Sequence, residues 1–365
     1  MPNFFFQNFI MNQSRLKNLI TFFIIIVTVA IIFTVFFERI FQRKNVPFLN
    51  LIRREPDRKL LPKYVNFSSS TLQWTMKQGQ NLTIVTSFWD IGSFQKGDHH
   101  IFSPSMYEEW AKVYGFLLNP LIIFTDSKHF KNLMSELRHD RQGFTKVIYM
   151  KKRKLWPFQL LMDIKSVFDQ PDYPKYHPNT VLAEYSAIQH AKYAAVGDAI
   201  RSNIFESEYY AWLDIGYFRD IVNDKRYFIL TPPENHNKSL LAMNEVYHPN
   251  LNLTPEEIFK QNVVWVGGGM FIGTRSVQLA FEELYKKAVL HFLGKKLMNS
   301  DQQVIYAMYS MEGTRSLKPN VELQLYSMKD DKSVGTRNPW FYLGFLCRHA
   351  VEIESQSVHL LNMTF

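Results

Sequence analysis

The segment that most constrains the fold is an uninterrupted apolar run from Tyr209 to Leu213, with the sequence Y-Y-A-W-L. Because polar residues do not alternate with apolar ones, the run is typical of a strand buried on both faces. Such strands lie inside parallel sheets covered by helices, and ligands bind beyond their carboxyl ends. Asp214 follows the run directly, and Gly216 allows a turn or the close approach of a ligand. We expect Asp214 either to cap this turn or, as we favour, to hold a metal-bound anionic ligand.

The length and composition indicate one large globular domain with accessory segments. A chain of 365 residues can bury a substantial core. The net charge of +9 suits an anionic ligand or a membrane surface, but no nucleic-acid motif accompanies it, so we expect no nucleic-acid partner. The single cysteine, Cys347, excludes an intrachain disulfide and C-x-x-C zinc sites. Its apolar neighbours favour a buried side chain over a nucleophile.

An amino-terminal segment without charges, Leu19 to Phe37, predicts a membrane anchor. As a helix it would rise roughly 28 Å, about the thickness of the bilayer hydrocarbon. The segment is longer than the apolar region of a signal peptide, and no small-residue cleavage motif follows it. We therefore predict a tail (1–18), a single transmembrane helix (19–37), a proline-containing stem (38–80) and an α/β domain (81–365).

The orientation of the predicted anchor depends on two opposing signals. Arg and Lys are more numerous after the segment than before it, which favours a cytosolic domain. Long domains, however, cross membranes largely regardless of flanking charge, and the chain carries acceptor sequons beyond the anchor. We favour a lumenal domain, with predicted glycosylation at Asn66, Asn237 and Asn362. A scaffold that faces the cytosol is the alternative.

Apolar runs alternate with helical segments along the domain, which predicts a mostly parallel α/β sheet flanked by helices. The expected strands before the central one are Leu82–Phe88, Pro120–Thr125 and Lys146–Met150. The expected helices lie near residues 103–118, 126–139, 158–168, 184–200 and 275–292, and residues 151–178 form a long irregular insertion.

The predicted helix at 184–200 places Lys192 in the middle of its apolar face, among residues such as Tyr185, Ile188 and Val196. An unpaired buried ammonium group is costly. Lys192 must therefore extend to the edge of this face or meet an anion, either a carboxylate or a phosphate.

Two further segments have both a structural and a functional interpretation. Gly267, Gly268 and Gly269 separate two apolar runs, so the backbone there must bend in a tight turn between strands or pack closely against a ligand or another chain segment. Their spacing does not fit a dinucleotide fingerprint. Ser300 and Gln303 predict a capping box that opens a helix. Asp301 complements the dipole of that helix, but a helix start can also direct an acid into a cleft, so Asp301 is a catalytic candidate.

Several of these segments together resemble nucleotide-sugar glycosyltransferases of the GT-A type and, more narrowly, the HtrL/YibB-type family. The most specific segment is A-W-L-D-I-G-Y-F-R at Ala211–Arg219. The resemblance extends over about Leu82–Tyr309. It also includes T-I-V-T-S-F-W-D-I-G (83–92), P-L-I-I-F-T-D (120–126), the helix that carries Lys192, and G-G-G-M-F-I-G (267–273).

The resemblance implies a metal site, because an Asp-x-Asp in such enzymes holds Mn²⁺ or Mg²⁺ on the donor diphosphate. Asp214 matches the first acid, whereas Gly216 stands where the second would be. Asp220, His349 or His359 would then have to complete the set of metal ligands.

The same resemblance suggests roles for the remaining candidates. Lys192 would neutralise a donor phosphate, and Asp301 would position or deprotonate the acceptor hydroxyl. Asp90 and Asp126, at strand ends, would either cap turns or contact the nucleoside. Gly268 and Gly269 would lie against the donor.

The expected function is therefore that of a membrane-anchored, metal-assisted glycosyltransferase in the Golgi or endoplasmic reticulum. It would use a nucleotide-sugar donor and a lumenal glycan or glycoprotein acceptor. The alternative is a non-catalytic lumenal domain that binds a glycan or a partner protein, which Gly216 favours.

Overall fold

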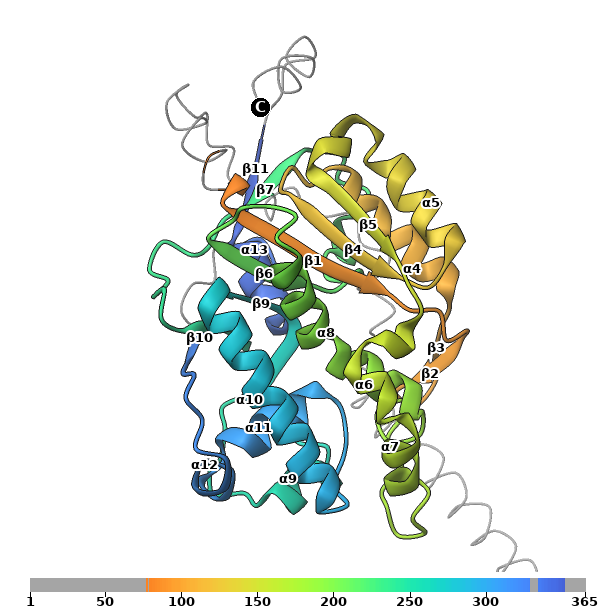
Figure 1. Ribbon diagram of the computed structural model, residues 1–365, viewed down its shortest axis with the longest axis vertical. Coiled ribbons are helices and arrows are strands. Elements are labelled where there is room, and N and C mark those ends of the chain that lie inside the picture. The colour runs from red at the N-terminus through yellow and green to blue at the C-terminus, as the bar shows by residue number, and fades with distance from the viewer. Residues whose placement is uncertain (1–76, 78, 329–333, 352–365) are drawn as a thin grey trace, which may run out of the picture. The chain divides into compact units, whose positions relative to one another are not determined.

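The computed structural model describes residues 77, 79–328 and 334–351 (Figure 1). The chain divides into two units, and all of these residues belong to the second, Leu60–Phe365. The predicted tail, anchor and most of the stem lie outside the described residues, as do Asn66, His359 and Asn362. Within the described part, no helix combines the length and the hydrophobicity needed to cross a bilayer.

A seven-stranded sheet organises the domain, with the strand order β10-β8-β9-β6-β1-β4-β5. Adjacent strands are parallel except at β9, which runs antiparallel to both of its neighbours, β6 and β8. The predicted mixed α/β architecture with a mostly parallel sheet is thus confirmed. The strands are β1 (Leu82–Phe88), β4 (Leu121–Thr125), β5 (Thr145–Tyr149), β6 (Tyr209–Leu213), β8 (Leu241–Glu245), β9 (Val266–Thr274) and β10 (Leu323–Ser327).

Two small antiparallel sheets and a set of helices surround the main sheet. The small sheets pair β2 (Phe94–Lys96) with β3 (His100–Phe102), and β7 (Phe228–Leu230) with β11 (Arg348–Ala350). The α-helices are α4 (Pro104–Ala111), α5 (Lys128–Leu137), α6 (Trp156–Gln159), α7 (Leu161–Phe168), α8 (Ala183–Ser202), α9 (Pro255–Lys260), α10 (Arg275–Gly294), α11 (Asp301–Tyr309), α12 (Met311–Leu317) and α13 (Tyr342–Leu346). Short 3₁₀ helices span Lys112–Gly115, His139–Phe144, Lys152–Lys154, Arg219–Ile221 and Pro339–Phe341.

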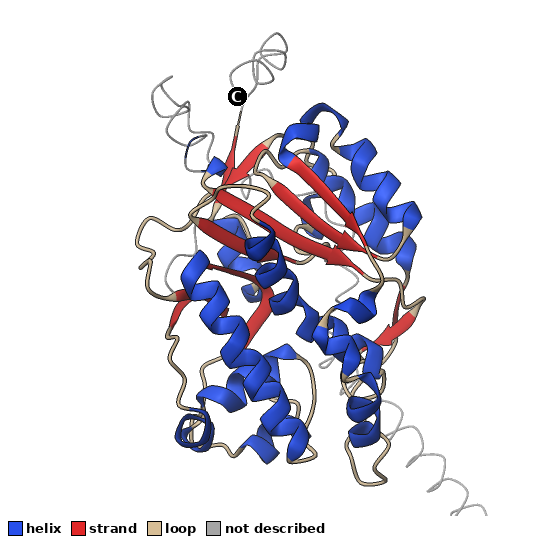
Figure 2. Cartoon of the chain, viewed as in Figure 1, coloured by secondary structure: helices blue, strands red, loops and turns tan. Residues whose placement is uncertain are grey.

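The sheet separates two hydrophobic cores, because successive side chains of a strand point to opposite faces. In β6, Tyr210 and Trp212 belong to the core beneath α8 and α10, whereas Tyr209, Ala211 and Leu213 belong to the core beneath α5 and α13. Figure 2 shows helices on both faces of the sheet. All five residues of β6 are buried, as predicted for a strand covered on both sides. Cys347 is buried in the second core and its burial raises its pKa, as expected for an inert thiol.

One local alternative is excluded and one local prediction is wrong. Gly267–Gly269 do not form a turn, because they lie within the continuous strand β9, where other elements pack closely against them. The capping box at the start of α11 is also absent: the Ser300 hydroxyl donates to Gln303 Oε1 (2.7 Å), and the Ser300 side chain accepts no backbone N–H. In β9, close packing of neighbouring elements outweighs the local sequence preference, whereas at Ser300 a local side-chain hydrogen bond replaces the cap.

Candidate active site

A buried ion cluster of Lys192, Asp214 and Asp301 lies beside the carboxyl end of β6. The Lys192 ammonium donates to Gly268 O (2.9 Å) and Asp301 Oδ2 (3.2 Å), and it lies 3.3 Å from Asp214 Oδ1. Three acceptors therefore surround a group that has three N–H donors. Of the two alternatives for Lys192, the structure shows the anionic partner, and the anions are two carboxylates of this chain.

Charge and burial determine the protonation of this ion cluster. Burial alone would lower the pKa of Lys192, but the charges of Asp214 and Asp301 outweigh it and raise the pKa above the usual 10.5. Burial raises the pKa of Asp301, and the charge of Lys192 only partly offsets this effect. The two carboxylates thus share one ammonium group that stays charged, because an opposite charge nearby favours the ionised form.

Asp214 is the member of the ion cluster that a ligand can reach. Its side chain is 40% exposed, whereas those of Lys192 and Asp301 are 3% and 0% exposed. Its N–H donates to Gly269 O (2.9 Å), which continues the pairing of β6 with β9. Trp212 Nε1 donates to Asp214 Oδ1 (2.7 Å) and so fixes the orientation of the carboxylate. The sheet therefore holds a rigid, accessible carboxylate at its carboxyl edge, where α/β proteins bind ligands.

Asp301 has no exposed surface in this arrangement. Its Oδ2 accepts from Lys192 and also lies 3.4 Å from the Tyr193 hydroxyl. A fully buried carboxylate cannot meet an acceptor hydroxyl in this conformation. The geometry therefore favours a positioning role for Asp301, which holds Lys192, over the predicted contact with an acceptor.

The glycines of β9 let other elements approach the strand closely. A Cβ atom on Gly268 would lie 2.0 Å from Asp301 Oδ2. One on Gly269 would lie 3.0 Å from the Tyr217 ring and 3.6 Å from Asp214 Oδ2. These contacts explain the glycines structurally, and the predicted contact with a donor stays a prediction.

Asp90 and Asp126 lie together after β1 and β4. Asp126 Oδ1 accepts from the Asp90 N–H (3.1 Å), and Asp90 Oδ1 accepts from the Gly92 N–H (2.9 Å). Lys152 approaches to 3.9 Å from Asp126 and 3.8 Å from Glu184. Asp90 thus caps its own turn, whereas Asp126 bonds to the backbone of that distant turn; the nucleoside contact of both stays a prediction.

The predicted metal ligands do not gather around Asp214 in the described part of the chain. Asp220 lies in the 3₁₀ turn Arg219–Ile221, and His349 Nε2 bonds to Thr231 Oγ1 (2.9 Å) in the β7–β11 region. Among the described residues, no three Asp, Glu, His or Cys side chains could hold a metal together. Asp214 Oδ1 already accepts from Trp212 and adjoins the Lys192 ammonium. Because a fixed cation lies beside the one exposed carboxylate of the ion cluster and repels a dication, these described residues fit Mn²⁺ or Mg²⁺ poorly.

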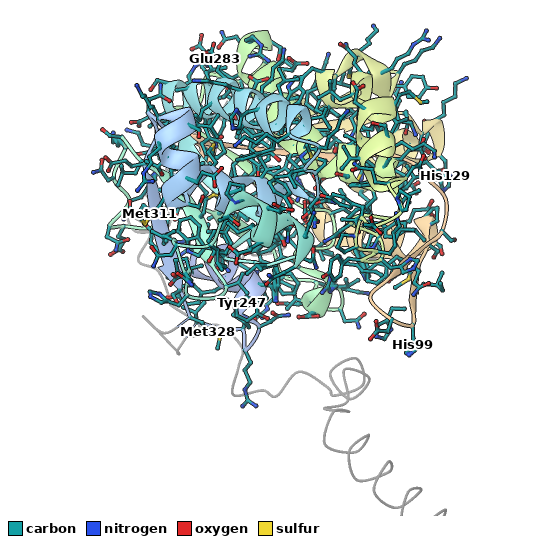
Figure 3. The ribbon with its side chains drawn as sticks, turned by 90° about the horizontal axis from the view of Figure 1, so that it is seen from below. His99, His129, Tyr247, Glu283, Met311 and Met328 are labelled. Atoms are coloured by element: carbon teal, nitrogen blue, oxygen red, sulfur yellow. The ribbon has the colours of Figure 1, made fainter. Side chains whose placement is uncertain are left out.

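Two cations near Asp214, Lys96 and Arg219, were not among the predicted site residues. The Lys96 ammonium lies 5.2 Å from the centre of the Phe102 ring. The Arg219 guanidinium carbon lies 5.6 Å from the Trp110 ring and 4.8 Å from the Phe341 ring. Arg219 is the last residue of the segment Ala211–Arg219, which resembles the HtrL/YibB-type family, so the resemblance could have identified it as a site residue. Lys96 lies in the β2–β3 hairpin, whose turn residue His99 is at the surface (Figure 3), and no sequence signal marks it.

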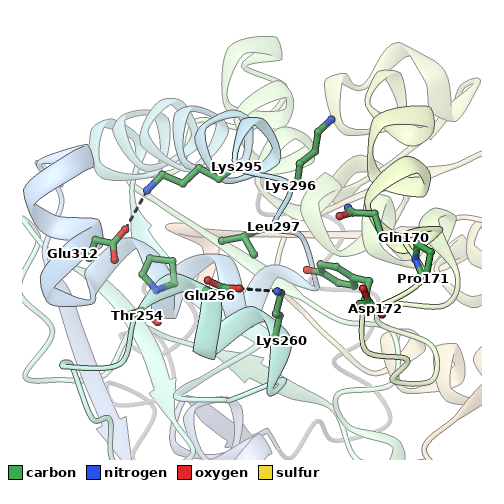
Figure 4. A pocket seen from close by; sticks show the side chains of 12 residues that line it. Gln170, Pro171, Asp172, Thr254, Glu256, Lys260, Lys295, Lys296, Leu297 and Glu312 are labelled. Atoms are coloured by element: carbon green, nitrogen blue, oxygen red, sulfur yellow. Dashed lines mark hydrogen bonds and ion pairs between the residues drawn. The ribbon is translucent and has the colours of Figure 1, made fainter.

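A separate pocket of about 580 Å³ lies among α9, the end of α10 and the segment after α7. Two ion pairs lie in its lining, Lys260 with Glu256 (2.6 Å) and Lys295 with Glu312 (3.1 Å) (Figure 4). Lys192, Asp214 and Asp301 do not line it, so the pocket is not part of the candidate site.

Comparisons with known proteins agree with the family resemblance. The family model described as "Bacterial protein of unknown function (HtrL_YibB)" matches residues 80–314. No curated protein sequence matches the chain. Core-mannan synthase A from Aspergillus fumigatus, in its Mn/GDP form, is similar in structure with a TM-score of 0.36 and 7% identity, over 67% of this chain and 72% of that one.

Two further solved structures show a similar degree of likeness. 4-Diphosphocytidyl-2C-methyl-D-erythritol synthase from Anaerococcus prevotii has a TM-score of 0.30 and 7% identity, over 79% of this chain and 97% of that one. PaToxG glycosyltransferase has a TM-score of 0.27 and 13% identity, over 75% and 92%. Scores at this level support no functional assignment.

Proposed function

The chain belongs to the HtrL_YibB family, and from this premise we propose that it transfers a sugar from a nucleotide-diphosphate donor to a glycan or glycoprotein acceptor. The observation that carries the proposal is Asp214, a partly exposed carboxylate held rigidly at the carboxyl edge of the sheet. This is the position at which α/β sheets bind nucleotides. The GT-A resemblance of the surrounding segments gives the donor class.

Asp214 supplies the acid–base chemistry in this proposal. An acceptor hydroxyl oxygen attacks the anomeric carbon of the donor, the bond from that carbon to the diphosphate breaks, and the hydroxyl proton passes to Asp214. The nucleoside diphosphate leaves with the bonding electrons. Lys192 and Trp212 keep the carboxylate in place, and Asp301 keeps Lys192 in place. No step of this proposed reaction uses the predicted Mn²⁺ or Mg²⁺, because the described side chains near Asp214 fit such an ion poorly.

We also propose that the predicted anchor at 19–37 holds the domain in the lumen of the Golgi or endoplasmic reticulum. Among the predicted glycosylation sites, Asn237 is exposed in the loop before β8, where a glycan could be attached. Mobility after glycosidase treatment tests this placement, and an unchanged mobility contradicts it.

Transfer and hydrolysis assays with UDP- and GDP-sugars test the proposed reaction. The full-length protein in detergent should consume at least one donor. Asp214→Asn should lower the rate by about 10²-fold or more, the typical contribution of a general base. Asp169→Asn, which removes an exposed carboxylate paired with Lys165, is the matched control and should leave the rate unchanged. Consumption of no donor, or equal rates for Asp214→Asn and the wild type, would overturn the proposal.

A second candidate function is a non-catalytic domain that binds a glycan. Gly216 favours it, since this residue stands where the second acid of the Asp-x-Asp is expected. Binding of glycans without any nucleotide-sugar binding would distinguish this function from the transferase.

A further inference from the structure

Lys96 and Arg219 lie on a shared aromatic platform, which we define as Phe102, Tyr107 and Trp110. The rings of Phe102 and Trp110 meet edge to face at 5.6 Å, and those of Tyr107 and Trp110 at 5.0 Å. Lys96 lies over Phe102, and Arg219 lies over Trp110. The two cations therefore occupy neighbouring rings of one cluster, where ring faces attract positive charge.

The aromatic platform borders Asp214 through Gly216. A Cβ atom on Gly216 would lie 2.7 Å from Cε3 of Trp110, so only glycine lets the indole pack at this distance. The charge of Asp214 acts on both Lys96 and Tyr107, which places the platform in the electrostatic surroundings of that carboxylate. The residue that replaces the expected second acid is thus the one that the aromatic platform requires.

Lys96 and Arg219 differ from Lys192 in having free hydrogen-bonding capacity. All three donors of Lys192 are directed at acceptors of this chain. Among the residues that the structure describes, by contrast, no carboxylate lies within ion-pair distance of Lys96 or Arg219. Arginine binds phosphate through two parallel hydrogen bonds, and lysine binds it as a point charge.

We propose that Lys96 and Arg219 form the binding site for the donor diphosphate, so that donor binding needs no divalent metal. The inference rests on the proposed function of the same site. The charge of Arg219 acts on Lys96, and a nucleoside diphosphate offers each of these two cations a phosphate group. They take over the charge neutralisation for which the expected metal lacks ligands, and Lys192 serves the carboxylates instead of the donor.

Calorimetry with inorganic pyrophosphate, UDP and GDP, in the presence of EDTA, tests the inference on the full-length protein. Binding should persist in EDTA. Lys96→Met and Arg219→Met should each weaken it by about tenfold or more, the value of a hydrogen bond to a charged group. Lys146→Met and Arg315→Met remove exposed cations from β5 and α12 and should bind like the wild type. Loss of binding in EDTA, or wild-type affinity of both site variants, would overturn the inference.

Proton uptake gives a second readout of Lys96. The Lys96 residue as a whole is exposed, but desolvation of its ammonium group, and next the charge of Arg219, lower the pKa of Lys96 to about 8. An anion bound there raises this pKa again, so binding just above pH 8 should take up protons and the measured heat should depend on the buffer. Lys96→Met should abolish this buffer dependence, and an unchanged dependence would contradict the assignment of Lys96.

The two proposals fail in different ways in these experiments. Pyrophosphate binding that depends on Lys96 and Arg219, without sugar transfer, would support the proposed anion site and contradict the proposed transferase activity. Sugar transfer that requires Mn²⁺ and proceeds at the wild-type rate in Lys96→Met and Arg219→Met would support the transferase activity and contradict the proposed anion site.

Discussion

Replacing Lys192 with methionine tests the ion cluster most directly. Methionine keeps an unbranched side chain of similar length, so the packing inside α8 changes little, but the ammonium is lost. Asp301 would then keep a buried carboxylate, with 0% side-chain exposure, and no cation beside it. Removing one partner from a buried ion pair typically costs about 3–5 kcal/mol. We expect Lys192→Met to lower the free energy of unfolding by an amount in this range at neutral pH.

The pH dependence of this loss identifies its cause. Burial already raises the pKa of Asp301, and removal of Lys192 raises it further. A carboxylate whose pKa is higher in the folded state than in the unfolded state makes the protein less stable as the pH rises through that interval. The cost of Lys192→Met should therefore be smaller in mildly acidic buffer, where Asp301 takes up a proton, and largest at neutral pH.

Urea unfolding followed by tryptophan fluorescence measures these changes. The double variant Lys192→Met/Asp301→Asn should recover part of the loss, because no buried charge remains, with a coupling energy of about 0.5–3 kcal/mol. Lys165→Met breaks an exposed pair with Asp169 and should cost about 1 kcal/mol or less. A cost for Lys192→Met as small as this control, with additive effects in the double variant, would refute the ion cluster.

Three further predictions concern Gly268, the alkaline range and Asn237. Gly268→Ala places a Cβ atom 2.0 Å from Asp301 Oδ2 and should lower stability by about 1–3 kcal/mol in thermal unfolding, whereas Gly143→Ala meets open space and should not. Because the pKa of Lys192 is raised above 10.5, its stabilising effect should be complete below pH 10.5 and lost as the pH rises further; a Lys192→Met variant that shows the same alkaline loss would contradict this. Asn237→Gln should abolish one glycosidase-sensitive mobility step, and an unchanged pattern would count against glycosylation at this site.

The strands β1, β4 and β6 were predictable from sequence because they are runs of apolar and β-branched residues, whereas the more polar β8 and β10 were not among the expected strands. Every residue of β6 is buried, and β1 begins and ends where its β-branched run does. The position of Lys192 was also informative, since a lysine on an apolar helix face requires a compensating partner. The sequence did not identify that partner as Asp301, which follows more than a hundred residues later.

The remaining errors come from contacts between distant elements and, at Ser300, from a competing local hydrogen bond. The glycines of β9 suggest a turn locally, but their lack of side chains instead accommodates Asp301 and Tyr217. Ser300 and Gln303 suggest a capping box, yet their side chains bond to each other. Lys96 belongs to the candidate site because the fold brings the β2–β3 hairpin beside Trp110 and Asp214. No local sequence pattern predicts that placement.

Lys192, Gly268 and Asp301 come from three separate elements, and the buried Asp301 carboxylate depends on the other two. Without Lys192, the buried Asp301 carboxylate has no cation beside it. Without Asp301, the Lys192 ammonium keeps one carboxylate fewer. Any side chain at position 268 would displace the Asp301 carboxylate. Natural relatives should therefore inherit these three residues as a set. A lineage that replaces one of them should carry compensating replacements at the others.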